Sequence, residues 1–138
     1  MQHELLQETK KYLTSIESNF LSELSKSDIE IAEEAEKYYN KGEYDRALQK
    51  LTDIKSETGI DHKATAIIYQ FGHKDQKKAE KYYLMAIKKA NVDAMYNLAL
   101  LYHTEHKDFN KAEKYYLMAI KKGNVNAMYN LALLYEEE

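Results

Sequence analysis

Apolar side chains recur at helical spacing through most of this chain. Steps of three and four residues, which place side chains on one helical face, relate Ala79, Tyr82, Tyr83, Ala86, Ile87 and Ala90. The same steps relate Ala94, Leu98, Leu101 and Tyr102. Neither segment alternates apolar and polar residues as a half-buried strand does. The pattern predicts an all-α protein with helices at residues 2–25, 28–41, 43–56, 61–71, 75–90, 92–104, 108–122 and 124–136.

Two adjacent segments of the chain are near copies of each other. Residues 73–105 and 106–138 carry the same amino acid at 27 of 33 positions. At the same offset, residues 66–69 match residues 99–102 in a third, degenerate copy, and residues 31–54 contain a fourth relative. Repeats of this length stack on their neighbours, with small alanines allowing close helix contacts and large tyrosines and leucines filling the space between. We therefore expect an array over residues 28–138, divided at about 28–58, 59–91, 92–124 and a partial unit at 125–138.

The first predicted helix differs from the repeats. It carries one apolar stripe with charged residues elsewhere, formed by Leu5, Leu6, Tyr12, Leu13, Ile16, Phe20, Leu21 and Leu24. We expect residues 1–27 to form a capping helix on the first repeat; a dimerising or partner-binding helix is the alternative.

Glycine and proline usage agrees with the predicted helix ends. The chain has no proline, and its four glycines are Gly42, Gly59, Gly72 and Gly123. All four fall where helices are expected to end, which is the usual place for a left-handed C-cap.

The segment from Ala94 to Asn124 resembles the Sel1-like repeat pattern A-x-x-x-L-G-x-x-Y, then D-x-x-K-A, an aromatic pair, alanine and G-N. The matching residues are Ala94, Leu98, Tyr102, Asp108, Lys111, Ala112, Tyr115, Tyr116, Ala119, Gly123 and Asn124. Residues 75–91 match the second half of the pattern again, and residues 31–54 resemble a tetratricopeptide repeat. Ala99 and Ala132 replace the usual glycine, and the turn before Asp108 is about three residues shorter than in the family.

The resemblance implies a right-handed α-solenoid that acts as a protein-binding scaffold without a catalytic site. By analogy with the tetratricopeptide groove, it places partner-binding residues on the concave side of each first helix. These residues are Lys63, Ile67, Gln70, Tyr96, Asn97, Leu100, His103, Tyr129, Asn130, Leu133 and Glu136. They offer apolar contact and amide hydrogen bonds to a peptide, but no cluster of basic residues that would clamp a C-terminal carboxylate. Packing within the inner surface is the alternative role for these side chains.

Candidate catalytic and metal sites are sparse. His103 and His106 flank Glu105, but no third zinc ligand is fixed nearby, so we expect a solvated pair in a loop and no metal or cofactor. The chain lacks a Gly-rich phosphate loop, a nucleophile elbow and a His-Glu-x-x-His motif, and no enzymatic activity is expected. The paired tyrosines recur at identical repeat positions, which favours packing over a ligand cage.

Charge and composition narrow the class of partner. The formal net charge is −3, so the basic surface required for nucleic acid is missing. No apolar run approaches the ~20 residues of a membrane span, and the N-terminus lacks the pattern of a signal peptide. We expect a cytoplasmic protein whose partner is a protein or peptide. A self-assembling structural protein is the main alternative, and a regulatory subunit whose chemistry resides elsewhere is a third.

The C-terminal segment predicts self-association. Residues 126–135 copy the first helix of a repeat, but no copy of residues 108–122 follows them. If Leu98, Leu101 and Tyr102 pack against the following helix, their copies Leu131, Leu134 and Tyr135 have no such partner within the chain. We therefore expect a homodimer through the C-terminal helix.

Overall fold

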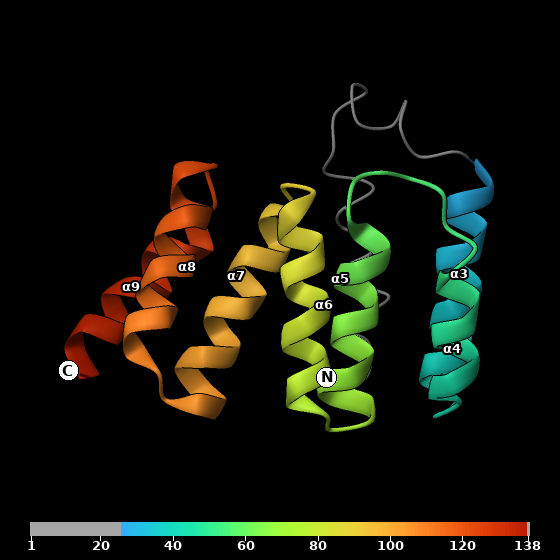
Figure 1. The fold of residues 1–138 in the computed structure, drawn as a ribbon, viewed down its shortest axis with the longest axis horizontal. Helices are drawn as coiled ribbons and strands as arrows, with labels where there is room; N and C mark the ends of the chain where they lie inside the picture. The colour runs from blue at the N-terminus through green and yellow to red at the C-terminus, as the bar shows by residue number, and fades with distance from the viewer. Residues whose placement is uncertain (1–25, 138) are drawn as a thin grey trace.

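The structure, a computed structural model, describes residues 26–137; the elements in this range are all helices, joined by turns and one longer linker, with no strand among them (Figure 1). The all-α prediction is confirmed. Two single π-helical turns continue α5 and α7, and the elements are α3 (Lys26–Asn40), α4 (Tyr44–Leu51), α5 (Ile60–Ile67), η1 (Ile68–Gly72), α6 (Gln76–Lys88), α7 (Val92–Leu101), η2 (Tyr102–His106), α8 (Phe109–Lys121) and α9 (Val125–Glu137). The predicted helix at 2–25 lies outside the described residues. No helix in the described range is long and apolar enough to cross a membrane.

The helices pack in the order in which they occur in the chain. The closest associations join α3 to α4, α5 to α6 and α7 to α8, and α6 and α8 pack on α7 and α9 in turn. Figure 1 shows these helices side by side from α3 to α9. The thinnest junction is that of α4 with α5 and η1. Each helix from α6 to α8 thus contacts both the helix before it and the helix after it.

The near-identical sequence segments adopt the same local structure. Helices α6 and α8 occupy equivalent residues, 33 positions apart. Asp75 and Asp108 cap them, each accepting a hydrogen bond from the backbone N–H three residues on, at 3.0 and 3.2 Å. Asn91 and Asn124 cap α7 and α9 in the same way, at 2.9 and 2.8 Å. These caps satisfy backbone donors that a helix start leaves unpaired, so the repeated residues define the repeated helix boundaries.

Small and large side chains share the core as the sequence pattern predicts. Ala79, Ala86, Ala112 and Ala119 are fully buried where helices meet. Tyr83 and Tyr116, the second tyrosine of each pair, are also fully buried, which confirms a packing role for them. The first tyrosine of each pair is half-buried.

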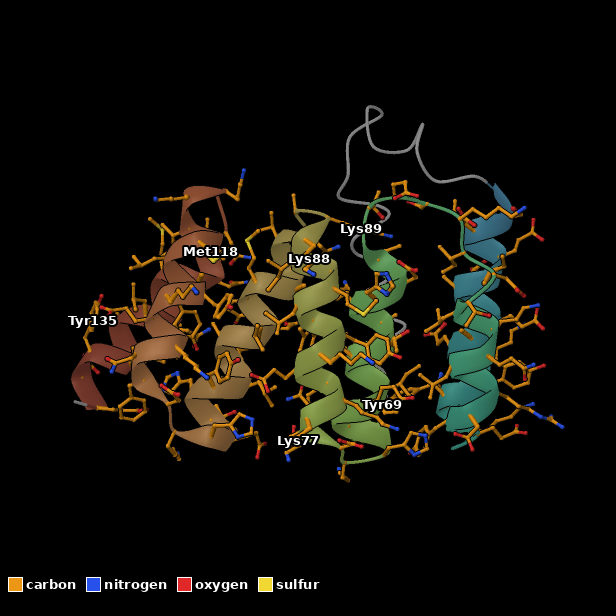
Figure 2. The ribbon with its side chains drawn as sticks, in the orientation of Figure 1. Tyr69, Lys77, Lys88, Lys89, Met118 and Tyr135 are labelled. Carbon is orange, nitrogen blue, oxygen red and sulfur yellow. The ribbon has the colours of Figure 1, made fainter. Side chains whose placement is uncertain are left out.

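The C-terminal helix α9 buries two of the three residues that were predicted to be uncovered. Leu131 is 7% exposed and Leu134 is fully buried, because they contact α8, the preceding helix. The prediction is therefore wrong for the two leucines, whereas Tyr135, the third residue that it named, is 48% exposed. The exposed large apolar residues of α9 are Val125, Met128, Tyr129 and Tyr135, and Tyr135 is labelled at the outer end of the molecule in Figure 2.

Glycines have more than one role in the helix connections. Gly42 and Gly123 follow helices and have φ of 79° and 91°, as predicted for left-handed caps. Gly59 is also left-handed, with φ of 81°, but it precedes α5 rather than ending a helix. Gly72 does not have positive φ; a Cβ there would lie 2.9 Å from Cδ1 of Tyr44. The C-cap prediction is wrong for Gly59 and Gly72, and the missing side chain of Gly72 permits close contact between η1 and α4.

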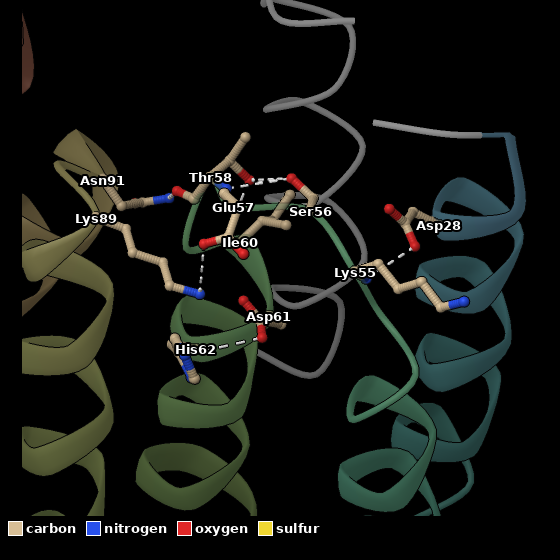
Figure 3. A network of polar contacts seen from close by, with 10 residues as sticks. All are labelled: Asp28, Lys55, Ser56, Glu57, Thr58, Ile60, Asp61, His62, Lys89 and Asn91. Atoms are coloured by element: carbon tan, nitrogen blue, oxygen red, sulfur yellow. Dashed lines mark hydrogen bonds and ion pairs between the residues drawn. The ribbon is translucent and has the colours of Figure 1, made fainter. Parts of the chain in front are cut away.

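The linker between α4 and α5 is held by polar contacts at both ends (Figure 3). Asp28 of α3 accepts a hydrogen bond from the backbone N–H of Lys55 at 3.2 Å. Ser56 Oγ accepts from the backbone N–H of Thr58 at 3.2 Å, which forms a tight local turn. Asn91 Nδ2 donates to the backbone carbonyl of Thr58 at 3.1 Å. The cap residue of α7 therefore also fixes the approach of the chain to α5.

Ala90 occupies the left-handed position that Gly123 occupies in the next copy. Its φ is 62°, where an L side chain meets the following carbonyl and costs roughly 1–2 kcal/mol. Replacing Ala90 by glycine removes that cost, but part of the gain is lost because glycine has more conformational freedom in the unfolded chain. Ala90→Gly should therefore raise the free energy of unfolding by about 0.5–1 kcal/mol, as measured by urea denaturation. The reverse change, Gly123→Ala, should lower it by a similar amount, and a destabilising Ala90→Gly would contradict this interpretation.

Candidate binding pocket

A pocket of about 180 Å³ lies between the C-terminal halves of two first helices. One wall comes from α5 and η1, the other from α7 and η2, and Tyr83 of α6 contributes to the lining. Ile67, Gln70, Asn97 and Leu100, all predicted partner-binding residues, line this one pocket. The structure thus brings together residues from two consecutive repeats.

Tyr83 and Gln70 form a hydrogen-bonded pair in the lining. Tyr83 is fully buried and its hydroxyl donates to Gln70 Oε1 at 2.7 Å. Within the described part of the chain, the side chain of Gln70 makes no other hydrogen bond. Because the tyrosine holds the amide oxygen, the amide orientation is set and Nε2 remains to donate to a ligand.

The rim of the pocket carries a negative charge. Glu105 is exposed, and it forms no ion pair with any described residue. Thr104 Oγ1 is engaged with the backbone carbonyl of Leu100 at 2.8 Å. The lining contains no lysine, arginine or histidine. A ligand carboxylate would therefore meet one like charge and no opposite charge, whereas a neutral or cationic group would not be repelled.

Four lining residues were not among the predicted binding residues: Phe71, Tyr83, Thr104 and Glu105. Phe71 and Thr104 lie four residues after Ile67 and Leu100, so extending the inner stripe by one step would have included them. Glu105 lies in the π-helical turn η2, whose wider backbone spacing a regular helical pattern does not represent. Tyr83 was assigned to the core, where its ring does lie, but its hydroxyl reaches the pocket residue Gln70.

The corresponding junction one repeat later is bridged by polar contacts. Asn130 Nδ2 on α9 donates to the hydroxyl of Tyr96 on α7 at 2.6 Å. His103 lies 2.9 Å from Tyr116 through Nδ1 and 2.9 Å from Glu137 through Nε2. Three predicted binding residues, Tyr96, His103 and Asn130, therefore join α7 and η2 to α8 and α9.

His103 is buried rather than solvated, which corrects the prediction of a solvated loop pair. It is 6% exposed, and its ring contacts the rings of Phe109 and Tyr116 edge-on. Burial, together with Tyr96 and Glu137, raises the pKa of Tyr116, so its phenol stays protonated. His103 thus links the Tyr116 hydroxyl and the Glu137 carboxylate through its two ring nitrogens.

The remaining predicted binding residues lie outside the pocket. Lys63 is fully buried and its Nζ lies 3.6 Å from Asp93 Oδ2, so its ammonium group is not presented to a partner as predicted. Tyr129, Leu133 and Glu136 are on α9, where Tyr129 and Glu136 are exposed and Leu133 is half-buried. No group of three or more histidine, cysteine, aspartate or glutamate side chains in residues 26–137 could hold a metal ion.

Comparison with known proteins supplies no family for the chain. No protein-family model, no curated protein and no solved structure matches it.

Proposed function

We propose that this chain is a right-handed α-solenoid of Sel1-like and tetratricopeptide-like repeats that binds a segment of a partner protein without catalysing a reaction. One observation carries the proposal: four residues expected on the inner face of two consecutive repeats line the same open pocket between α5 and α7. The 33-residue sequence copies with matching helix boundaries support the repeat architecture.

The pocket lining fits an extended peptide segment. Ile67, Phe71 and Leu100 offer an apolar surface for one anchoring side chain. The amide of Gln70 lies beside it, and its Nε2 can donate a hydrogen bond to a peptide carbonyl. Since no basic residue lines the pocket, the segment is internal to the partner rather than a free C-terminal carboxylate.

A random peptide library displayed on phage, selected on the full chain, tests this function. Selected peptides should bind the wild-type chain saturably, and Leu100→Arg should weaken binding by about tenfold or more because it places a charge in the apolar lining. Leu117→Arg, at an exposed leucine of α8 outside the pocket, is the matched control and should bind like the wild type. Circular dichroism of both variants verifies the helical fold.

Equal loss of binding in the two variants would mean that the selected peptides do not bind at the pocket. Failure of the library to yield any peptide that distinguishes the wild type from Leu100→Arg would contradict the proposed function.

A further inference from the structure

The pocket between α5 and α7 combines an apolar lining with an acidic rim. Its volume, about 180 Å³, is below the roughly 300–1,000 Å³ of pockets that enclose a drug-sized molecule, so it fits a single side chain. Ile67, Phe71 and Leu100 provide the apolar contact, and Glu105 lies at the exposed rim. A side chain with an aliphatic stem and a cationic end has the same order of properties.

Two rim side chains, Thr104 and Glu105, present hydrogen-bond acceptors. Thr104 Oγ1 donates its own hydrogen to the backbone carbonyl of Leu100 at 2.8 Å, so this oxygen is left to accept further bonds. The ionised carboxylate of Glu105 also only accepts, and it forms no ion pair with any described residue. A positively charged group with several hydrogen-bond donors would satisfy both side chains.

The next junction along the chain contains such a pairing within the protein itself. There His103 Nε2 lies 2.9 Å from the carboxylate of Glu137, so a basic side chain of one wall meets an acidic side chain of the other. His103 and Glu137 correspond to Gln70 and Thr104, which lie 33 residues earlier. In the first pocket the wall opposite Glu105 carries the neutral Gln70 in place of histidine. The lining of this pocket therefore contains an acid without a base.

Arginine fits this lining better than lysine does. Its planar guanidinium can lie on an aromatic ring while it donates to a carboxylate, whereas the ammonium of lysine is a compact and strongly hydrated charge. Phe71 is half-buried in the lining, and within residues 26–137 its ring neither stacks on another ring nor lies beneath a cation. Phe71 belongs to η1 and Glu105 to η2, the two opposite walls of the pocket.

We propose that the pocket binds an arginine side chain of the partner segment. Its methylene groups pack on Ile67 and Leu100, and its guanidinium lies between the Phe71 ring and the carboxylate of Glu105. Gln70 Nε2 then donates to the peptide backbone beside the arginine. The inference rests on the proposed function, because it names the residue that the same site recognises.

The 138 residues of this chain are a less suitable source of the cation. Their only arginine, Arg46 on α4, lies 3.0 Å from the carboxylate of its neighbour Glu43. Residues 1–25 lie outside the described range; their sequence contains two lysines and four glutamates, so a segment of net negative charge would approach a negative rim. Charge complementarity therefore favours a basic segment of another protein.

The test uses peptides selected from a phage library on the full chain, which should share an arginine. One selected peptide is synthesised with this arginine and with citrulline in its place, which keeps the shape and removes the charge. Fluorescence anisotropy should show that citrulline weakens binding to the wild type by about fivefold, the upper range for an exposed ion pair. The difference should shrink as salt is added, because exposed charges are screened.

Glu105→Gln removes the opposite charge and should weaken binding of the arginine peptide by a similar factor. The two peptides should then bind this variant equally, because the interaction that separates them is gone. Glu136→Gln, at an exposed position of α9 outside the pocket, changes the net charge by the same amount and should leave both affinities unchanged.

The outcomes separate this inference from the proposed function. Peptides that bind the wild type but not Leu100→Arg, and that contain no arginine or tolerate citrulline, would overturn the inference and leave the function in place. Equal effects of Glu105→Gln and Glu136→Gln would also overturn it. A library that yields no peptide would contradict both.

A last variant examines the chain's own lysines at positions 10 and 11. Replacing Lys10 and Lys11 by glutamine should leave the affinity for the arginine peptide unchanged. If it instead raised that affinity in the wild type but not in Glu105→Gln, the pocket would hold the first residues of this chain, and the proposal of a partner arginine would be overturned.

Discussion

Replacing Leu134 by alanine should lower the free energy of unfolding by about 2–5 kcal/mol, because the side chain is fully buried between α9 and α8. The loss combines the transfer of apolar atoms with the cavity that they leave. Leu117→Ala removes the same atoms from a side chain that is 44% exposed, and should change stability by less than about 0.5 kcal/mol.

Urea denaturation of the two variants measures the difference. The effect of Leu134→Ala should not depend on protein concentration, because Leu134 packs within one chain. A small effect at low concentration that grows as the chain is concentrated would instead place Leu134 at a contact between molecules.

Asn91→Ala should destabilise the fold by about 2 kcal/mol, roughly half from the N-cap of α7 and half from the buried bond to the linker. Asn91 Oδ1 accepts from the backbone N–H of Ala94, and Nδ2 donates to the carbonyl of Thr58. The residue is 1% exposed, so water does not replace either partner well. Asn124→Ala removes the equivalent cap of α9, with no linker bond, and should cost only about 1 kcal/mol.

Thermal or urea unfolding of both asparagine variants compares the two sites directly. Equal destabilisation would mean that the Thr58 contact adds nothing, and that the linker is not fixed by α7.

Much of the fold can be predicted from the sequence because the repeat provides two constraints, one on the type of secondary structure and one on the helix boundaries. The apolar period predicts helices, and the near-identical copies require equivalent boundaries, which the asparagine and aspartate caps provide. The predicted segments at 61–71 and 92–104 correspond to α5 with η1 and α7 with η2. The period does not reveal the π-helical turns, since these depend on how the last turn of each helix packs.

The assignment of helix faces is less determined by the pattern. Ala94, Leu98 and Leu101 form one apolar stripe of α7, and Met95, Ala99 and Tyr102, the first residue of η2, form another that is rotated by one residue. Both stripes are buried, so the apolar period does not show which of them packs on the preceding helix and which on the following one. Only the exposure pattern of α9, which lacks a following helix in the described chain, separates them.

The residue spacing also predicted only part of the candidate site. Ile67, Gln70, Asn97 and Leu100 face one pocket because the spacing of inner-face positions repeats. Spacing does not distinguish an open junction from a bridged one, and that difference depends on side-chain identity. At the second junction His103 and Glu137 replace Gln70 and Thr104, and they meet across it.

The pocket is the centre of this account, and methyl NMR of the full chain with a selected peptide tests it most directly. With isoleucine and leucine methyl groups labelled, the Ile67 and Leu100 signals should shift as peptide is added and saturate together, while the Leu117 signals remain in place. Unchanged Ile67 and Leu100 signals, with shifts confined to methyl groups elsewhere in the chain, would contradict a binding pocket between α5 and α7.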